Sequence, residues 1–392
     1  MAKQIAILGS TGSIGTNTLR VIDALGPDFC VAALSAHSNV ELLAQQARRY
    51  RPAVVAITDA ACAKQLQDLI GDLDIEILSG PQALVEIAEA EDVDTVVTAI
   101  VGAAGLWAAF AACGKGKTIA LANKEPLVIA GRLLTSLAKE NGATILPIDS
   151  EHSAVFQAMQ AGTHRQVRKI ILTASGGPFR DKSPEDIENV TLEQALAHPV
   201  WDMGPKITVD SATMVNKALE VIEARWLFDM PVDKIEVLIH PESIVHSLVE
   251  FVDGSVIAQL SQPDMCIPIQ YALTYPMRAP GIAERLRLEE TKKLTFFAPD
   301  MDKFRALLLG YEAARAGGTA PAVFNAANEA AVQDFLAKKI RFVTIVELIE
   351  HCLDKHNVRT TPSIEELLEA DAWARNEVAK EVAHTSTGAI KQ

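Results

Sequence analysis

Two carboxylates stand two positions apart in the segment Asp149-Ser150-Glu151-His152, after an apolar run over residues 143–148 that predicts a buried strand. On an extended backbone, side chains two residues apart point the same way. We therefore expect Asp149 and Glu151 to direct their oxygens to one point beyond the strand's carboxyl end, where open α/β sheets bind ligands. With a third acid, Glu220, they would suit Mg²⁺ or Mn²⁺, which prefer oxygen ligands. The alternative for the acidic pair alone is a polar strand end beside a solvated helix.

A second group of polar side chains lies on a predicted helix over residues 211–228. Asn216 and Glu220 are four residues apart, and Lys217 and Glu220 are three apart, so all three share one helical face. Ser211 is placed to cap the start of this helix. A cap, an amide, an ammonium and an acid at one helical end indicate a phosphate site beside a metal site. Taken singly, each is better explained as an ordinary cap or a surface salt bridge.

Two loops extend this group. Ser175-Gly176-Gly177-Pro178-Phe179 follows a predicted strand over 167–173 and can form a turn whose N–H groups and hydroxyl hold an anion. The loop over 198–205 contains two prolines and a glycine, which bar regular structure. We expect this loop to close over a substrate and exclude water. The alternative is that Trp201 anchors the loop onto the core.

The chain opens with a predicted strand, a glycine-rich turn and a helix. The turn, Gly9-Ser10-Thr11-Gly12-Ser13-Ile14-Gly15, has the spacing G-x-x-G-x-x-G, a variant of the dinucleotide-binding pattern. Its glycines let the backbone approach a pyrophosphate at the helix N-terminus. The alternative is a purely structural turn.

The end of the second predicted strand distinguishes between the two nicotinamide cofactors. No carboxylate occurs there before Glu41, and the segment offers the neutral side chains of His37, Ser38 and Asn39. An acid would repel a 2′-phosphate, whereas neutral donors can bind it. The segment therefore favours NADPH, although His37 is equally compatible with a simple surface loop.

One lysine follows the sixth predicted strand. Lys124, in Asn123-Lys124-Glu125-Pro126, begins a helix at the carboxyl end of that strand. From this place it would reach toward both cofactor and substrate. Taken alone, a lysine here is more often a solvated surface group.

The order of predicted elements divides the chain into four parts. Residues 1–149 alternate helices with continuous apolar strands, which predicts an α/β fold with a Rossmann-type parallel sheet covered on both faces. Residues 150–278 predict a central α+β catalytic and dimerisation domain with antiparallel pairing, in which Asp253-Gly254 forms a hairpin. Residues 279–300 are expected to be a linker, and 301–392 a helical domain. The strands are expected at 5–8, 30–34, 53–57, 95–101, 118–122, 144–148, 167–173, 236–239, 244–252 and 255–260.

The composition limits the classes of function. The 392 residues are 49% hydrophobic and 22% charged, as in ordinary globular proteins, and the net charge of −14 argues against binding to nucleic acid or an anionic membrane. The five cysteines are scattered without metal-type spacing, which suits a reducing compartment. No signal segment precedes the first strand, and no apolar run reaches the ~18 residues of a membrane span. We expect a cytoplasmic protein.

Together these motifs closely resemble those of the 1-deoxy-D-xylulose 5-phosphate reductoisomerase family. That family forms 2-C-methyl-D-erythritol 4-phosphate for isoprenoid synthesis, with NADPH and a divalent metal ion. The resemblance spans essentially the whole chain and also implies a homodimer with a V-shaped, three-domain subunit. The motifs that carry it, in family order, occupy residues 9–15, 122–125, 149–152, 175–180, 198–201, 210–220 and 325–329.

The resemblance implies a role for each site residue. The metal ligands would be Asp149, Glu151 and Glu220. The substrate phosphate would be held by Ser175, Ser211, Asn216 and Lys217, with His198 nearby. The rest of the substrate would contact Lys124, Ser150 and Glu151. NADPH would contact Thr11, Gly12, Ser13, Ile14, Asn123, Glu125 and Gly204. The site would be covered by Trp201 and Met203. Some members have glycine and lysine where this chain has His37 and Ser38.

The implied chemistry suits these residue types. A metal ion bound to adjacent carbonyl and hydroxyl oxygens of a ketose phosphate acts as a Lewis acid for a rearrangement, by an α-ketol or a retro-aldol/aldol route. Catalytic roles would fall to Lys124, Glu151 and His198, of which Lys124 or Glu151 could relay protons. One rival is a semialdehyde-type dehydrogenase, which needs a catalytic cysteine that no convincing turn supplies. Another is a non-catalytic NADP(H)-binding regulator, which leaves the three acids without a purpose.

Overall fold

The structure, a computed structural model, describes residues 2–100, 102–201 and 203–388, with backbone only for 385–388. The chain forms two compact units. The first comprises Met1–Pro126, Arg132–Ser153 and Asp264–Arg285, and the second comprises Leu127–Gly131, Ala154–Pro263 and Leu286–Gln392. The expected division into four domains stays a prediction. Within the described part of the chain, no helix combines the length and apolar character needed to cross a membrane.

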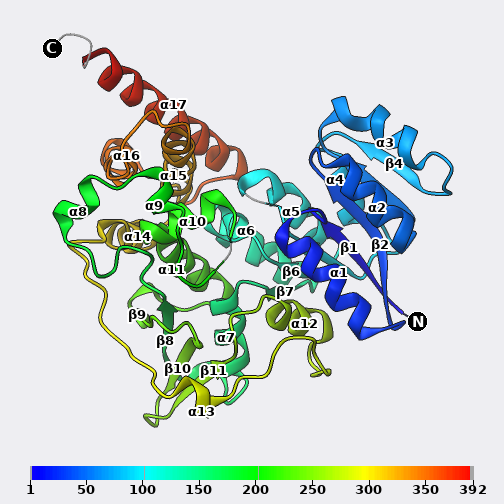
Figure 1. The fold of residues 1–392 in the computed structure, drawn as a ribbon, viewed down its shortest axis with the longest axis horizontal. Helices are drawn as coiled ribbons and strands as arrows, with labels where there is room; N and C mark the ends of the chain where they lie inside the picture. The colour runs from blue at the N-terminus through cyan, green and yellow to red at the C-terminus, as the bar shows by residue number, and fades with distance from the viewer. Residues whose placement is uncertain (1, 101, 202, 389–392) are drawn as a thin grey trace. The chain divides into compact units, whose positions relative to one another are not determined.

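The first unit is built on a seven-stranded sheet in which all strands run parallel, as predicted (Figure 1, blue to teal). Its order is β4-β3-β2-β1-β5-β6-β7, so the chain changes direction across the sheet between β1 and β5. Ligands bind at such a switch point, outside the carboxyl ends of the strands. The strands are β1 (Lys3–Leu8), β2 (Phe29–Ala36), β3 (Val54–Ile57), β4 (Glu76–Ser79), β5 (Thr95–Thr98), β6 (Thr118–Leu121) and β7 (Thr144–Pro147).

Two strand predictions needed revision. The edge strand β4 was missed, because its four residues are only half buried or exposed and lack a continuous apolar run. The strand expected over 95–101 ends at Thr98, and Val101 lies outside the described residues. The helices of this unit are α1 (Ser13–Leu25), α2 (Val40–Tyr50), α3 (Ala63–Ile70), α4 (Ala83–Glu89), α5 (Leu106–Gly114), most of α6 (Glu125–Asn141), the start of α7 (Ser150–Met159), and α12 (Cys266–Thr274).

The second unit contains a four-stranded sheet of order β11-β10-β8-β9. The predicted hairpin is confirmed, since β10 and β11 pair antiparallel across Asp253 and Gly254, and Gly254 has the positive φ of 88° that such turns favour. The sheet is mixed rather than purely antiparallel, because β8 pairs antiparallel with β10 but parallel with β9. The strands are β8 (Val167–Ala174), β9 (Ile235–Ile239), β10 (Val245–Phe251) and β11 (Val256–Leu260).

Helices make up the rest of the second unit, and the helical character expected from residue 301 onward is confirmed for the described residues (Figure 1). The segment 279–300, expected to be a linker, holds the short helix α13 and a bridge between Ile239 and Phe297. The helices are α8 (Pro184–Glu188), α9 (Leu192–Ala195), α10 (Pro205–Ala212), α11 (Val215–Leu227), α13 (Leu288–Thr291), α14 (Arg305–Ala316), α15 (Ala320–Leu336), α16 (Thr344–Lys355) and α17 (Ile364–Gly388).

Candidate active site

The glycine-rich turn joins β1 to α1 at the carboxyl edge of the parallel sheet. Gly9 has φ +87°, and a Cβ atom there would lie 2.5 Å from the carbonyl oxygen of Ala99. A Cβ atom at Gly15 would lie 2.3 Å from the carbonyl oxygen of Gly9. The N-cap of α1 is Gly12, which has no side chain to accept the first N–H groups of the helix. The turn thus has the tight form that presents a helix N-terminus to an anion.

Hydrogen bonds from buried polar residues fix the conformation of this turn. Ser10 donates its N–H to the carbonyl of Ser35 (2.8 Å) and its hydroxyl to Gln46 Oε1 (2.7 Å). Gln46 Nε2 donates back to the carbonyl of Ser10 (2.9 Å). Sequence reasoning gave Gln46 no role, although a glutamine on the otherwise apolar face of a predicted helix was a signal. The turn is therefore fixed in shape before any ligand binds.

The three residues expected at the 2′-phosphate follow β2 directly and are exposed. His37 Nδ1 lies 2.9 Å from Thr58 Oγ1, which orients the ring. Asn39 Oδ1 accepts the N–H of Leu42 at 3.2 Å and so caps α2, which leaves its NH₂ group to donate elsewhere. The exposed segment over residues 37–39 therefore offers hydrogen-bond donors and contains no carboxylate.

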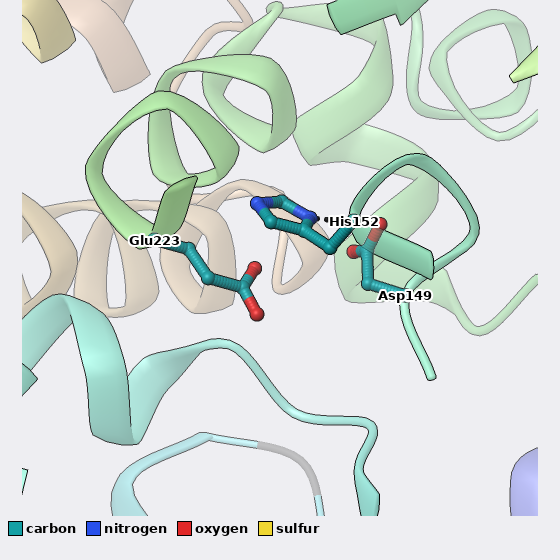
Figure 2. A group of neighbouring side chains, drawn as sticks. All are labelled: Asp149, His152 and Glu223. Atoms are coloured by element: carbon teal, nitrogen blue, oxygen red, sulfur yellow. Dashed lines mark ion pairs between the residues drawn. The ribbon is translucent and has the colours of Figure 1, made fainter. Parts of the chain in front are cut away.

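Lys124 and Asp149 form a buried ion pair at the ends of β6 and β7. Lys124 Nζ lies 2.6 Å from Asp149 Oδ2, and their side chains are 7% and 11% exposed. His152 Nδ1 lies 3.3 Å from Asp149 Oδ1 (Figure 2). Burial alone would raise the pKa of Asp149, but the Lys124 ammonium and the bond from His152 hold it well below its usual range. Asp149 is therefore ionised at neutral pH.

The expected geometry of the acidic pair was wrong. β7 ends at Pro147, and α7 begins at Ser150, so Asp149 and Glu151 do not alternate on a strand. Asp149 instead caps the helix: its Oδ1 accepts the N–H of Glu151 at 3.2 Å. Aspartate is a favoured N-cap and acids are stabilised in a first helical turn, which is why the strand stops here. Both acids still lie at the carboxyl edge of the sheet.

Two buried residues without a predicted role accompany these acids in sequence. His152 lies three residues after Asp149 and is 0% exposed, and Glu223 lies three residues after Glu220 on α11 and is 1% exposed. Figure 2 draws Asp149, His152 and Glu223. A spacing of three on a helix places side chains on one face, and this signal was available in the sequence.

The shared helical face of the second polar group is confirmed. Asn216 Nδ2 donates to Glu220 Oε1 at 2.6 Å, and Lys217 Nζ pairs with Glu220 Oε2. Lys217 and Glu220 are buried, at 3% and 1% exposure. A buried carboxylate next to a buried ammonium is stable only as a pair. These residues therefore form a compact polar centre at the start of α11.

The expected N-cap role of Ser211 was wrong. The predicted helix over 211–228 is two helices, and Ser211 lies near the end of α10. The break occurs at Met214, whose φ of 64° is left-handed. Thr213 Oγ1 accepts the N–H of Val215 at 3.3 Å and thereby supports the start of α11. Neither glycine nor proline marks this break, so the residue pattern predicted one continuous helix.

The Ser175 turn and the end of α10 are in direct contact. Gly176 and Gly177 both have positive φ, 81° and 67°. A Cβ atom at Gly177 would lie 2.8 Å from the carbonyl oxygen of Ser211. Only glycine allows this approach, so the turn brings Ser175 and Ser211 to the same end of α10.

His198 fixes the direction of the Ser175 hydroxyl. Its Nδ1 accepts the N–H groups of Val200 (3.2 Å) and Trp201 (2.9 Å), so the ring proton is on Nε2. Nε2 lies 3.1 Å from Ser175 Oγ, which also accepts the N–H of Gly177 at 3.2 Å. With two donors directed at its oxygen, Ser175 keeps its own proton for an anion. Burial lowers the pKa of His198, which favours this neutral ring.

The loop over 198–204 has no regular secondary structure in its described residues, as predicted. Trp201 is half buried, with its ring centroid 6.4 Å from that of His246. Gly204 is exposed and is the N-cap of α10, while Met203 is half buried and Asp202 lies outside the described residues. The proposed closure of this loop stays a prediction.

The remaining predicted cofactor residues flank Lys124. Asn123 and Glu125 are buried, at 7% and 5% exposure. Neither Oδ1 nor Nδ2 of Asn123 has a hydrogen-bond partner among the described residues. An unpaired buried amide costs about 1–3 kcal/mol, and a ligand that supplies a donor and an acceptor removes this cost.

Comparison with known proteins assigns the family. A family model of 1-deoxy-D-xylulose 5-phosphate reductoisomerase matches residues 5–131, and two models of the C-terminal domain of that enzyme match residues 145–228 and 260–377. Similar curated proteins include the reductoisomerases of Chloroherpeton thalassium, 53% identical over 96% of this chain and 97% of the relative, and of Agathobacter rectalis, 52% identical over 96% and 99%. The chain belongs to the 1-deoxy-D-xylulose 5-phosphate reductoisomerase family.

Solved structures of this family confirm the fold. The Zymomonas mobilis enzyme in complex with NADPH has a TM-score of 0.92 at 44% identity, covering 97% of this chain and 99% of that one. A family member in complex with NADPH, fosmidomycin and magnesium has a TM-score of 0.93 at 44% identity, covering 98% and 99%. The predicted α/β class with a helical C-terminal region is therefore confirmed.

Proposed function

We propose that this protein converts 1-deoxy-D-xylulose 5-phosphate into 2-C-methyl-D-erythritol 4-phosphate with NADPH and Mg²⁺ or Mn²⁺. One observation carries the proposal. The carboxyl edge of a single parallel sheet holds a phosphate-type glycine turn after β1, Lys124 after β6, and the carboxylates of Asp149 and Glu151 after β7. A cofactor turn, an ammonium and a pair of hard oxygen donors at one edge suit a metal-dependent reductase. Relatives that bind NADPH and magnesium support it.

The residues of the first unit fit NADPH. The tight turn over residues 9–15 would present the N-terminus of α1 to a pyrophosphate, and the buried amide of Asn123 lacks partners among the described residues. Neutral donors after β2 would bind the 2′-phosphate. The proposed contacts are Thr11, Gly12, Ser13, Ile14, His37, Ser38, Asn39, Asn123, Glu125 and Gly204.

The acids fit a hard divalent cation. Asp149, Glu151 and Glu220 offer only carboxylate oxygens, which is the ligand chemistry that Mg²⁺ and Mn²⁺ prefer. Asp149 is already ionised, since Lys124 and His152 lower its pKa. We assign the three acids as ligands, and the bound cation would supply a Lewis acid for the substrate's carbonyl and hydroxyl oxygens.

The second unit would hold the substrate phosphate. Ser175 keeps a hydroxyl proton to donate, because His198 and Gly177 already donate to its oxygen. Ser211 lies against the same turn, and Asn216 and Lys217 begin the next helix. Hydroxyl, amide and ammonium donors together match the acceptor oxygens of a phosphate. Fixing this remote group turns its binding energy into orientation of the reacting carbons.

The protein's own residues would then manage protons and water. Lys124 Nζ, which pairs with Asp149, would donate to a substrate oxygen, and Glu151 would accept a hydroxyl proton, with Ser150 donating to Glu151 Oε2 as an orienting bond. Closure of the loop around Trp201 would exclude water from the aldehyde that precedes hydride transfer.

The test follows NADPH consumption with deoxyxylulose phosphate, with and without a chelator. Glu220→Gln keeps the shape of the side chain but removes its charge, so turnover should be lost while the affinity for NADPH, measured by direct titration, stays near that of the wild type. Glu185→Gln, at an exposed position on α8, is the matched control and should be fully active. Normal metal-dependent turnover in Glu220→Gln would contradict the metal assignment.

We further propose that the protein is a homodimer that pairs through the four-stranded sheet. β11 is one of the two edge strands of this sheet, and Val256 and Ile257 on it are 48% and 38% exposed. An apolar edge strand offers unpaired backbone groups to a second copy. Light scattering should give twice the chain mass, and Ile257→Lys should give the monomer; a wild-type monomer would overturn this part. Cytoplasmic location stays a prediction.

A further inference from the structure

A buried carboxylate lies beside the proposed phosphate site without taking part in it. Asp210, next to Ser211 on α10, is 1% exposed. Its Oδ1 accepts the NH₂ group of Asn328 on α15 at 2.9 Å, and its Oδ2 pairs with Lys206 Nζ at 2.9 Å. The aspartate thus ties α10 to α15, a helix that begins at Ala320.

The end of α10 also packs closely against the turn that contains Gly177. The carbonyl of Ser211 lies so close to Gly177 that a Cβ atom there would be 2.8 Å away. A rotation of α10 about its axis would therefore move Ser211 into or away from the turn that carries Ser175. The Asp210–Asn328 bond opposes this rotation, because it joins the helix to α15 one residue before Ser211.

The buried side chain of Asn328 is not optimal for the stability of the fold. Its side chain is 0% exposed, and its Oδ1 has no hydrogen-bond partner among the described residues. Leaving a buried carbonyl unpaired costs free energy that an apolar residue of the same size would not cost. The amide pays this cost and gives one directed N–H bond to Asp210. This bond joins two helices, α15 and α10, rather than two residues of one helix.

We propose that Asn328 is a positioning residue for the substrate phosphate: by donating to Asp210 it fixes α10, and with it Ser211, against the Ser175 turn. This rests on the proposed function, whose phosphate site it extends to α15. The side chain of Asn328 donates to Asp210, which is not among the residues assigned to substrate, metal or cofactor.

The chain offers a matched control on the same helix. Asn325 lies three residues earlier, is also 0% exposed, and also has an unpaired Oδ1 among the described residues. Its Nδ2 donates to a carboxylate too, but that carboxylate is Glu329 at 3.2 Å, on α15 itself. Asn328→Asp and Asn325→Asp each place a second carboxylate against an existing one, and only the first acts on α10.

The experiment uses the full-length protein and steady-state kinetics with deoxyxylulose phosphate. Asn328→Asp should raise the KM for this substrate at least about tenfold, the effect of losing a hydrogen bond to a charged group. The KM for NADPH should change by less than about twofold. In the double variant Asn328→Asp with Asp210→Asn, the amide at position 210 would donate to the carboxylate at position 328, so the hydrogen bond is restored with its direction reversed. The KM for deoxyxylulose phosphate should then return to the value of Asp210→Asn alone. Asn325→Asp should leave KM unchanged.

Equal rises in KM for Asn328→Asp and Asn325→Asp, or no rescue in the double variant, would overturn the proposal in favour of a purely structural tie. If Asn328→Asp does not fold, Asn328→Leu replaces it, with the same expected rise in KM and a Tm within about 4 °C of the wild type. Hydrogen exchange at the amides of residues 211–217 gives a readout that needs no turnover: Asn328 variants should exchange faster there, and Asn325→Asp should not. If the wild type lacks activity, the proposed function fails, and hydrogen exchange alone decides this proposal.

Discussion

Removing the Ser175 hydroxyl tests the most constrained donor of the proposed phosphate site. The oxygen of Ser175 accepts from His198 Nε2 at 3.1 Å and from the N–H of Gly177 at 3.2 Å, so its proton points away from both. Ser175→Ala removes the donor and leaves the two N–H groups without their acceptor. The backbone of the turn should survive, because glycines with positive φ set its shape.

The magnitude follows from the charge of the acceptor. A hydrogen bond to a charged group contributes about 1.5–3 kcal/mol, which corresponds to about 10- to 150-fold in affinity. We therefore expect kcat/KM for deoxyxylulose phosphate to fall by that factor in Ser175→Ala. The KM for NADPH should not change, since Ser175 and the glycine turn belong to different units.

The assay is steady-state NADPH oxidation at saturating cofactor and metal. Ser136→Ala, at an exposed position on α6, serves as the control and should match the wild type. A kcat/KM for Ser175→Ala within twofold of the wild type would refute the reasoning, because it would mean that the oriented hydroxyl does not meet the phosphate.

The remaining predictions concern pH and the cofactor turn. Burial holds the pKa of His198 below its ordinary value of 6.5, so the bonds of its neutral ring stabilise the loop fully above pH 6.5 and are lost as the pH falls through the lowered pKa. The kcat/KM of the wild type should therefore fall on the acid side, and His198→Asn, which cannot titrate, should lose that part of the profile; an unaltered profile would exclude His198 as its origin. Gly9→Ala places a methyl group 2.5 Å from the Ala99 carbonyl and should weaken NADPH binding at least tenfold in a fluorescence titration, whereas Gly26→Ala, with a similar φ of +82° and no atom within 4 Å, should bind NADPH normally.

The strands of the parallel sheet could be predicted where their side chains are buried. Six of the seven strands of the parallel sheet are continuous apolar runs, and such runs indicate strands covered on both faces. β4 escaped because Glu76 and Ser79 at its ends are exposed, so the strand leaves no apolar run. The hairpin at Asp253-Gly254 could be predicted because its φ requirement restricts the residue type.

The local geometry of the candidate site residues could be predicted from the sequence only in part. The face shared by Asn216, Lys217 and Glu220 followed from helical spacing alone. The strand assigned to Asp149 and Glu151 failed because an aspartate after an apolar run is equally a helix cap, and only the backbone distinguishes the two. The break at Met214 could not be predicted, because a methionine with positive φ is held by the surrounding packing rather than by its own preference.

Each of the two units contains a lysine paired with a carboxylate that is assigned to the metal ion. A carboxylate that is to bind a cation must be ionised, yet burial favours its neutral form. In the first unit Lys124 pairs with Asp149, and in the second Lys217 pairs with Glu220. The same two ammonium groups are those that an anionic substrate would need. Because breaking a buried ion pair without replacement is costly, we expect each lysine to turn to the substrate only when a bound cation takes its place at the carboxylate.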